Sequence, residues 1–114
     1  MKLRYIHIRP PVDQDEWGNP LHCMNHGGFT IAYFATENDN NTITIEWNYA
    51  ICHDKENFNK KLGREIAKGR FYSLRLNNFF SNFNSIGQFY DHLSDLNSHK
   101  LQTQYPIHPS DNNW

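Results

Sequence analysis

Positive charge is concentrated in residues 55–70, which carry six Lys or Arg side chains against two Glu, although the formal charge of the whole chain is −1. In a helix, Lys60, Arg64 and Lys68 would follow one another at intervals of four residues and form one stripe, with Lys61 beside it. Guanidinium groups donate two parallel hydrogen bonds to a phosphate, and ammonium groups add a compact charge. The spacing therefore predicts an anion-binding surface, and the alternative is a solvated helix face.

Aromatic residues make up 15% of the chain, which is enough to supply both a core and a ring for stacking on a nucleobase. Trp47 lies in an alternating segment and is expected in the core, whereas Trp17 lies in a long loop and is expected to be exposed. A ring beside the cations could stack on a purine whose phosphates the cations hold. The candidate ligand-binding set is Lys60, Lys61, Arg64, Lys68, Arg70, Arg75, Trp17 and Phe71.

A weaker candidate is a zinc site. Cys23 and His26 form a Cys-x-x-His pair, and Cys52 and His53 are adjacent. Cys52 and His53 would point to opposite sides of a strand, so both can bind one ion only if the strand has ended there. The alternative is ordinary packing and loop contacts, and no cofactor is expected.

The chain lacks the usual sequence signatures of catalysis. No Gly-x-Ser-x-Gly motif occurs, and Gly27-Gly28 precedes an expected strand rather than a helix, unlike a phosphate-binding loop. The expected helix 55–69 contains no His, which argues against the helix ligands of a metal-dependent nuclease. No enzymatic activity is therefore expected.

Three segments have the composition of strands. Residues 29–35 and 42–52 are rich in β-branched and aromatic side chains, and the second places Ile43, Ile45, Trp47, Tyr49 and Ile51 on one face. The polar turn 37–41 between them predicts an antiparallel hairpin. Residues 2–8 predict an N-terminal strand, which Pro10 and Pro11 end.

Two helices are expected after the hairpin. Asp54 is the predicted N-cap of the first, Phe58, Leu62 and Ile66 its apolar face, and Gly69 its end. Ser85 is the predicted N-cap of the second, whose apolar stripe contains Ile86, Phe89, Tyr90, Leu93 and Leu96. Residues 71–76 fit either a helix or an extended segment, and the tail from residue 103 is expected to be irregular. The sequence thus predicts an α+β fold in which a hairpin and an N-terminal strand pack against two or three C-terminal helices.

The length of 114 residues predicts a single α+β domain spanning residues 1–114. The core is expected to be small, because hydrophobic residues make up only 38% of the chain. We expect a homo-oligomer, whose assembly would enlarge the core. No long apolar run or signal-like start occurs, so we expect a cytoplasmic protein that does not enter a membrane. The near-neutral charge argues against a dedicated duplex-DNA-binding protein.

The segment from Asp54 to Arg70 also carries a resemblance. With Gly63-Arg64, Ile66-Ala67 and Gly69-Arg70 in a helix after a strand that ends in Cys52, it resembles small phage and prophage proteins. The order of hairpin, helix and terminal helical segment over residues 29–70 is similar to the phage anti-Thoeris sponge proteins. That resemblance implies sequestration, without cleavage, of a cyclic ADP-ribose signal in the cytoplasm of a bacterial host.

Three functional hypotheses follow. The first is a phage-type counter-defence protein that binds and sequesters a small phosphorylated, cyclic nucleotide signal. The second is a protein inhibitor of a host immune protein, such as an anti-CRISPR protein that occupies a nuclease, with residues 71–90 at the interface. The third is a small metal-dependent nuclease or nucleic-acid-binding protein.

Overall fold

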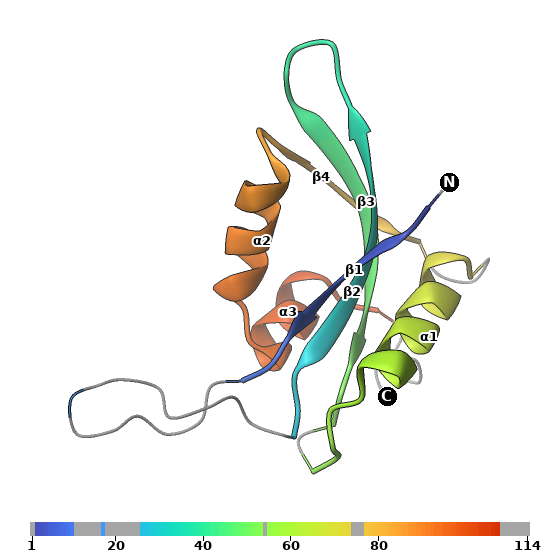
Figure 1. The fold of residues 1–114 in the computed structure, drawn as a ribbon, viewed down its shortest axis with the longest axis vertical. Coiled ribbons are helices and arrows are strands. Elements are labelled where there is room, and N and C mark those ends of the chain that lie inside the picture. The colour runs from blue at the N-terminus through green and yellow to red at the C-terminus, as the bar shows by residue number, and fades with distance from the viewer. Residues whose placement is uncertain (1, 11–16, 18–25, 54, 74–76, 108–114) are drawn as a thin grey trace.

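The computed structural model describes residues 2–10, 17, 26–53, 55–73 and 77–107 (Figure 1). Its strands are β1 (Arg4–Ile8), β2 (Phe29–Glu37), β3 (Ile43–Ile51) and β4 (Phe79–Phe83), which form one antiparallel sheet in the order β1-β2-β3-β4. The predicted hairpin, N-terminal strand and α+β class are confirmed. Strand β4 was not predicted.

The hairpin of β2 and β3 pairs Phe29 with Ile51 at one end and Glu37 with Ile43 at the other. Its turn is closed by the N–H of Asn38, which donates to the carbonyl oxygen of Thr42 at 2.9 Å. Asn41 has a φ of 64°, a conformation that Asn tolerates better than most residues. The polar turn predicted from the sequence is therefore the turn that forms.

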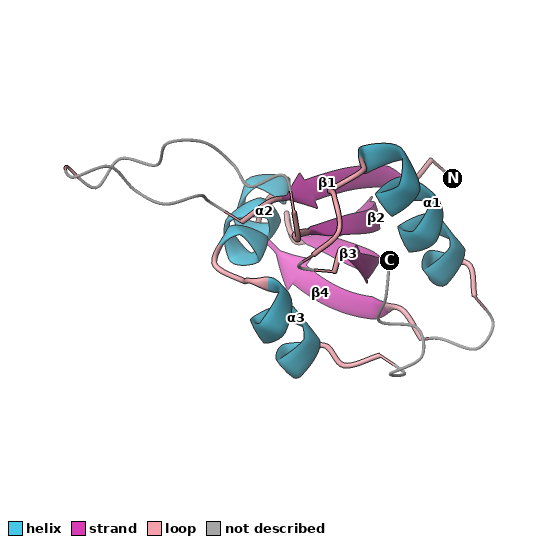
Figure 2. Ribbon diagram, turned by 90° about the horizontal axis from the view of Figure 1, so that it is seen from below, coloured by secondary structure: helices cyan, strands magenta, loops and turns pink. Residues whose placement is uncertain are grey.

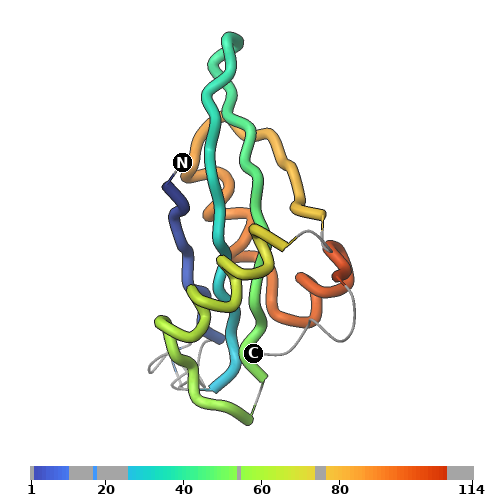
Figure 3. The backbone as a smooth tube through the Cα atoms, turned by 90° about the vertical axis from the view of Figure 1, so that its right-hand side faces the viewer, coloured from blue at the N-terminus to red at the C-terminus, as the bar shows by residue number. Residues whose placement is uncertain are grey.

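Helices cover both faces of the sheet (Figure 2). Helix α1 (Lys60–Phe71) packs on one face, and α2 (Ile86–Ser94) lies against the other, together with α3 (Ser98–Gln104). Figure 3 shows β1 and β4 at the two edges of the sheet, with the β2–β3 hairpin extending beyond the helices. The molecule is a three-layer arrangement with its larger core on the α2 side.

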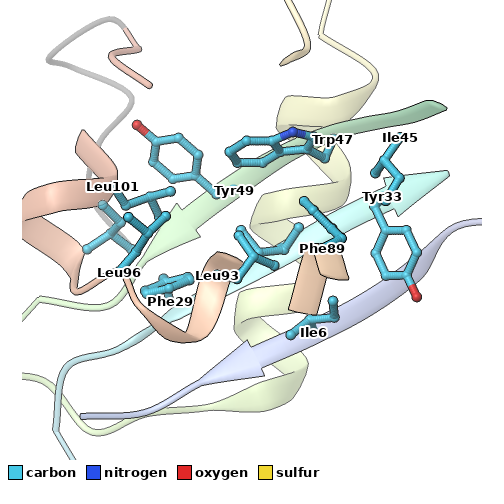
Figure 4. Close-up of a cluster of buried hydrophobic side chains, with 12 residues drawn as sticks. Ile6, Phe29, Tyr33, Ile45, Trp47, Tyr49, Phe89, Leu93, Leu96 and Leu101 are labelled. Atoms are coloured by element: carbon cyan, nitrogen blue, oxygen red, sulfur yellow. The ribbon is translucent and has the colours of Figure 1, made fainter. Parts of the chain in front are cut away.

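That larger core consists of alternate side chains from the strands and of the buried stripe of α2 (Figure 4). Trp47 is fully buried, as predicted, and its ring centroid lies 5.8 Å from that of Phe89 and 5.0 Å from that of Phe79. Such aromatic pairs add about 0.5–1.5 kcal/mol beyond the burial of their area. The core residues are Ile6, Phe29, Ile31, Tyr33, Ile45, Trp47, Tyr49, Ile51, Phe89, Leu93, Leu96 and Leu101.

Helix α1 begins later and is rotated relative to the prediction. Asn59 is its N-cap, because the Asn59 side chain accepts a hydrogen bond from the N–H of Leu62 at 3.0 Å. The predicted cap, Asp54, lies outside the described residues. The helix continues beyond Gly69 to Phe71, and Tyr72 is its C-cap.

The face of α1 against the sheet is built from small residues rather than from the predicted Phe58–Leu62–Ile66 stripe. Gly63 and Ala67 are buried, Ile66 is partly buried, and Leu62 is 38% exposed. The opposing sheet surface presents Ala32 and Ala50. Small side chains on both sides let the helix approach the sheet closely, and Leu62 lies outside this contact.

Helix α2 has the predicted N-cap, since Ser85 Oγ accepts from the N–H of Gln88 at 3.3 Å. Of the predicted stripe, Phe89, Leu93 and Leu96 are buried, whereas Ile86 and Tyr90 are 39% and 48% exposed. Helix α3 was not predicted, and it extends past residue 103, where the sequence suggested an irregular tail. Leu101 anchors α3 in the core.

Candidate functional site

The candidate site lies at the end of the sheet where β1 and β3 both finish. These two strands run parallel to each other because both are antiparallel to β2, and Phe29 at the start of β2 pairs with both Ile8 and Ile51. The residues that follow Ile8 and Ile51 therefore emerge at the same end of the sheet. Arg9 and His53 are brought together in this way.

The close approach of the chain at this end requires a glycine. Gly28 has a φ of +95°, and a Cβ on it would lie 2.5 Å from the carbonyl oxygen of Ile8. Its own carbonyl oxygen accepts from the N–H of Cys52 at 2.9 Å. Gly28 thus fixes the ends of β1 and β3 on either side of β2.

A cavity of about 500 Å³ occupies this end of the sheet, on the side covered by α2 and α3. Its apolar lining includes Ile8, Phe29, Ile51 and Leu96, the last from the connection between α2 and α3. The polar side chains that line it are Arg9, His53, Ser94, Asn97, Ser98, His99 and Gln102. A volume of several hundred Å³ with a few convergent polar groups is typical of small-molecule sites.

Arg9 is oriented by an aromatic ring. Its guanidinium carbon lies 4.9 Å from the ring centroid of Phe58, a cation–π arrangement. The same Phe58 ring meets His7 edge-on at a centroid distance of 5.8 Å. Phe58, which the sequence placed on the apolar face of a helix, instead precedes α1 and positions two polar side chains.

A second hollow of about 460 Å³ adjoins the cavity and shares Ile8, Arg9 and Ser94 with it. Its remaining lining residues are His7, Lys60 and Tyr90. The hollow lies beside β1, between the start of α1 and the exposed side of α2. Arg9 therefore faces the cavity from one side and the hollow from the other.

Three cations act on His7 at this end of the sheet. His7 donates to or accepts from Thr30 Oγ1 through Nδ1 at 2.8 Å. Burial lowers the pKa of His7 to about 4, and the charges of Lys60, Arg64 and Arg9 contribute to the shift. His7 is consequently neutral near pH 7, and the three cations that affect it come from α1 and from the residue that follows β1.

The predicted cationic stripe is only partly directed toward this site. Lys60, Lys61, Arg64 and Lys68 are all exposed, and among them Lys60 lines the hollow. Arg64 is close enough to Tyr5 and His7 to oppose the rise in the pKa of Tyr5 and lower that of His7. The end of the stripe that contains Lys60 and Arg64 faces β1.

Arg70 and Phe71 lie away from the exposed stripe, on the side of α1 that packs on the sheet. Arg70 is 8% exposed, and its Nη1 donates to the carbonyl oxygen of Tyr49 at 3.0 Å. Phe71 is 5% exposed and packs in the smaller core with Ala32, Ala50 and Ala67. Of the other predicted ligand-binding residues, Trp17 is 78% exposed and Arg75 lies outside the described residues.

The described residues of the zinc hypothesis differ in burial. Cys52 is buried, and its Sγ lies 3.3 Å from the carbonyl oxygen of Glu56, whereas His53 and His26 are exposed. Cys23 lies outside the described residues. Among the described residues, no three His, Cys, Asp or Glu side chains are grouped so that they could hold a metal ion.

Arg9 and His99 are the functional candidates that sequence reasoning missed. The signal for Arg9 was available, because an N-terminal strand beside a hairpin places Arg9 and His53 at one end of the sheet. His99 gave no such signal, since α3 has no clear apolar period in the sequence.

Within the described chain, no helix has the length and apolar character needed to cross a bilayer.

Comparison of the chain with protein-family models, with curated proteins and with solved structures finds no match.

Proposed function

We propose that this protein binds a small phosphorylated ligand of nucleotide size, without transforming it, in the cavity at the end of the sheet. The observation that carries the proposal is the convergence of Arg9, His53 and His99 on one apolar-floored cavity of about 500 Å³. The apolar residues suit a nucleobase or ribose, and the three basic side chains suit phosphate oxygens.

Two features support phosphate as the recognised group. The positive charges of Lys60, Arg64 and Arg9 act on His7, which lines the hollow that adjoins the cavity. In addition, none of the described residues lining the cavity or the hollow is acidic. A bound phosphate would therefore meet hydrogen-bond donors and no carboxylate among the described lining residues.

The narrower form of the proposal is sequestration of a cyclic nucleotide signal by a phage-type counter-defence protein in a bacterial host. It rests on the resemblance of residues 54–70 to phage proteins and on the similarity to the anti-Thoeris sponge proteins. In this form the ligand is a cyclic ADP-ribose isomer, and the protein lowers its free concentration by binding alone.

Calorimetry with ADP-ribose, its cyclic isomer and adenosine tests the proposal. The two phosphorylated ligands should bind in the micromolar range and adenosine should bind much more weakly. Arg9→Gln should weaken binding by about tenfold or more, because a hydrogen bond to a charged group contributes about 1.5–3 kcal/mol.

The matched control is Arg4→Gln, which changes an exposed arginine at the other end of β1, outside the cavity. It should leave the affinity for ADP-ribose unchanged. Equal binding of adenosine and ADP-ribose, or equal effects of the two arginine substitutions, would show that the cavity does not recognise phosphate.

A protein interface is the second candidate function, favoured by two exposed aromatic rings, one on β4 and one at the end of α1. Phe80 is 67% exposed and Tyr72 is 50% exposed, although both are large aromatic residues. Such rings are common anchors in interfaces with another protein. Capture of one stoichiometric host protein by the natural chain, lost in Phe80→Ser but retained in Arg9→Gln, would favour this function over ligand binding.

A further inference from the structure

The outer edge of β1 is a candidate binding surface separate from the cavity. β1 pairs with β2 on one side, and no described strand pairs with it on the other. Figure 3 shows β1 at one edge of the sheet, away from β4. An edge strand presents backbone N–H and C=O groups that a further extended chain can pair with.

Successive side chains of β1 point to opposite faces of the sheet. Tyr5 packs with the smaller core under α1 and His7 bonds to Thr30, whereas Ile6 and Ile8 pack with the larger core on the α2 side. A strand added beside β1 would follow the same alternation. Its side chains would alternately meet α1 and α2.

The α1 side of this edge is cationic. Lys60 lines the hollow with His7 and Arg9, and Arg64 is near enough to affect the pKa of both Tyr5 and His7. Lys60 and Arg64 are one helical turn apart and both exposed. They form a basic surface on the α1 side of β1.

The α2 side exposes two apolar side chains. Ile86 and Tyr90 are 39% and 48% exposed, and they too are one helical turn apart. Ile86 lines a hollow with Lys2 and Arg4 near the start of β1, and Tyr90 lines the hollow near its end. These two side chains form an apolar surface that no described part of the chain covers.

We propose that the outer edge of β1 is a docking site for an extended peptide in which acidic residues alternate with apolar ones. The acidic side chains would meet Lys60 and Arg64, the apolar ones would meet Ile86 and Tyr90, and the backbone would extend the sheet. The described residues that line the two hollows beside β1 include Lys2, Arg4, Arg9 and Lys60 and no acidic residue.

The charge of this edge favours an acidic partner over a second copy of the chain. Pairing two β1 edges would bring two sets of Lys60 and Arg64 together, along with Arg4 and Arg9 from each copy. Like charges brought together at an interface disfavour association. An acidic peptide instead neutralises them.

Fluorescence anisotropy with a labelled peptide that alternates glutamate and valine tests the proposal. The peptide should bind at low salt, and its affinity should fall as salt is raised. Arg64→Glu should weaken binding by about tenfold, because it replaces an attraction with a repulsion. The matched control, Lys100→Glu on exposed α3, should leave the affinity for the peptide unchanged.

Three further measurements keep the test decisive. A peptide with lysine in place of glutamate should not bind, and Tyr90→Ser should weaken binding of the acidic peptide. Hydrogen exchange of the β1 backbone amides should slow when the acidic peptide is added. Equal effects of Arg64→Glu and Lys100→Glu, unchanged exchange in β1, or a stable dimer that Ile86→Ser dissociates would each overturn the proposal.

The docking proposal and the cavity proposal can be rejected independently of each other. Tyr90 is uncharged and does not line the cavity, so Tyr90→Ser should retain binding of ADP-ribose while weakening binding of the peptide. Failure of peptide binding with ADP-ribose binding intact would reject only the docking site. The reverse result would reject only the cavity proposal.

Discussion

At the scale of single residues, the same basic side-chain type serves two purposes in α1. Lys60 and Arg64 are exposed and add to the positive field near His7, whereas Arg70 is buried and donates to the carbonyl oxygen of Tyr49. A buried guanidinium requires such partners because desolvation of an unpaired charge is costly. Arg70 therefore has a structural role that its place in a basic segment did not reveal.

Replacement of Arg70 by methionine should destabilise the fold by about 1–3 kcal/mol, since it leaves the buried carbonyl of Tyr49 without this donor. Urea unfolding measures the change. Lys68→Met, two residues earlier and exposed, is the control and should change stability by less than about 0.5 kcal/mol. Similar losses in both variants would contradict a structural role for Arg70.

His7 predicts a pH dependence of stability. Its pKa is about 4 in the folded protein and near 6.5 in the unfolded chain, so between these values the unfolded state binds the proton more readily. Stability should therefore fall as the pH is lowered from 6.5 to 4, by less than about 1.4 kcal/mol per pH unit because His7 is partly solvated. His7→Gln should flatten this part of the stability–pH profile, and an unchanged slope would contradict the assignment.

At the scale of elements, the close approach of α1 to the sheet depends on small residues. Ala67 is fully buried against a surface that contains Ala32 and Ala50. By contrast, a Cβ added at Gly69 would meet nothing within 4 Å. The two positions lie two residues apart in the same helix and should respond in opposite directions to a larger side chain.

Ala67→Leu should destabilise the protein by about 1–3 kcal/mol through overpacking. Gly69→Ala should stabilise it by up to about 1 kcal/mol, because alanine favours the helix and the position is open. Thermal and urea unfolding of both variants check the pair. A tolerated Ala67→Leu would mean that α1 is not packed closely on the sheet.

Elements with a clear alternation or cap were predictable from the sequence. The β2–β3 hairpin followed from the alternation of Ile43, Ile45 and Trp47, and the start of α2 followed from Ser85. The rotation of α1 was not predictable, because its smallest residues rather than its largest apolar ones face the sheet. Strand β4 was missed because its alternation, Phe79, Ser81 and Phe83, spans only five residues.

The candidate site was less predictable than the fold because it is assembled from segments far apart in the chain. The sequence identified a basic helix, of which Lys60 and Arg64 lie near the site. It did not identify Arg9, whose position depends on β1 and β3 running in the same direction. The spacing of residues within one helix does not show which strands of a sheet end side by side.

At the scale of the whole molecule, several basic residues gather at one end of the sheet although the net charge is −1. Arg9, His53 and His99 line a cavity there, and the charges of Lys60 and Arg64 act on His7 beside it. The β2–β3 hairpin projects away from this end (Figure 1). Ligand binding should therefore perturb one end of the molecule and leave the hairpin turn unchanged.

Titration of isotope-labelled protein with ADP-ribose, followed by NMR, tests the binding proposal most directly. The backbone amide signals of Arg9, His53 and His99 should shift in a saturable manner, while those of residues 38–42 in the hairpin turn should not. Adenosine should produce much smaller shifts. An absence of shifts around the cavity at millimolar ADP-ribose, or shifts confined to Lys61 and Lys68 on the open face of α1, would contradict the account.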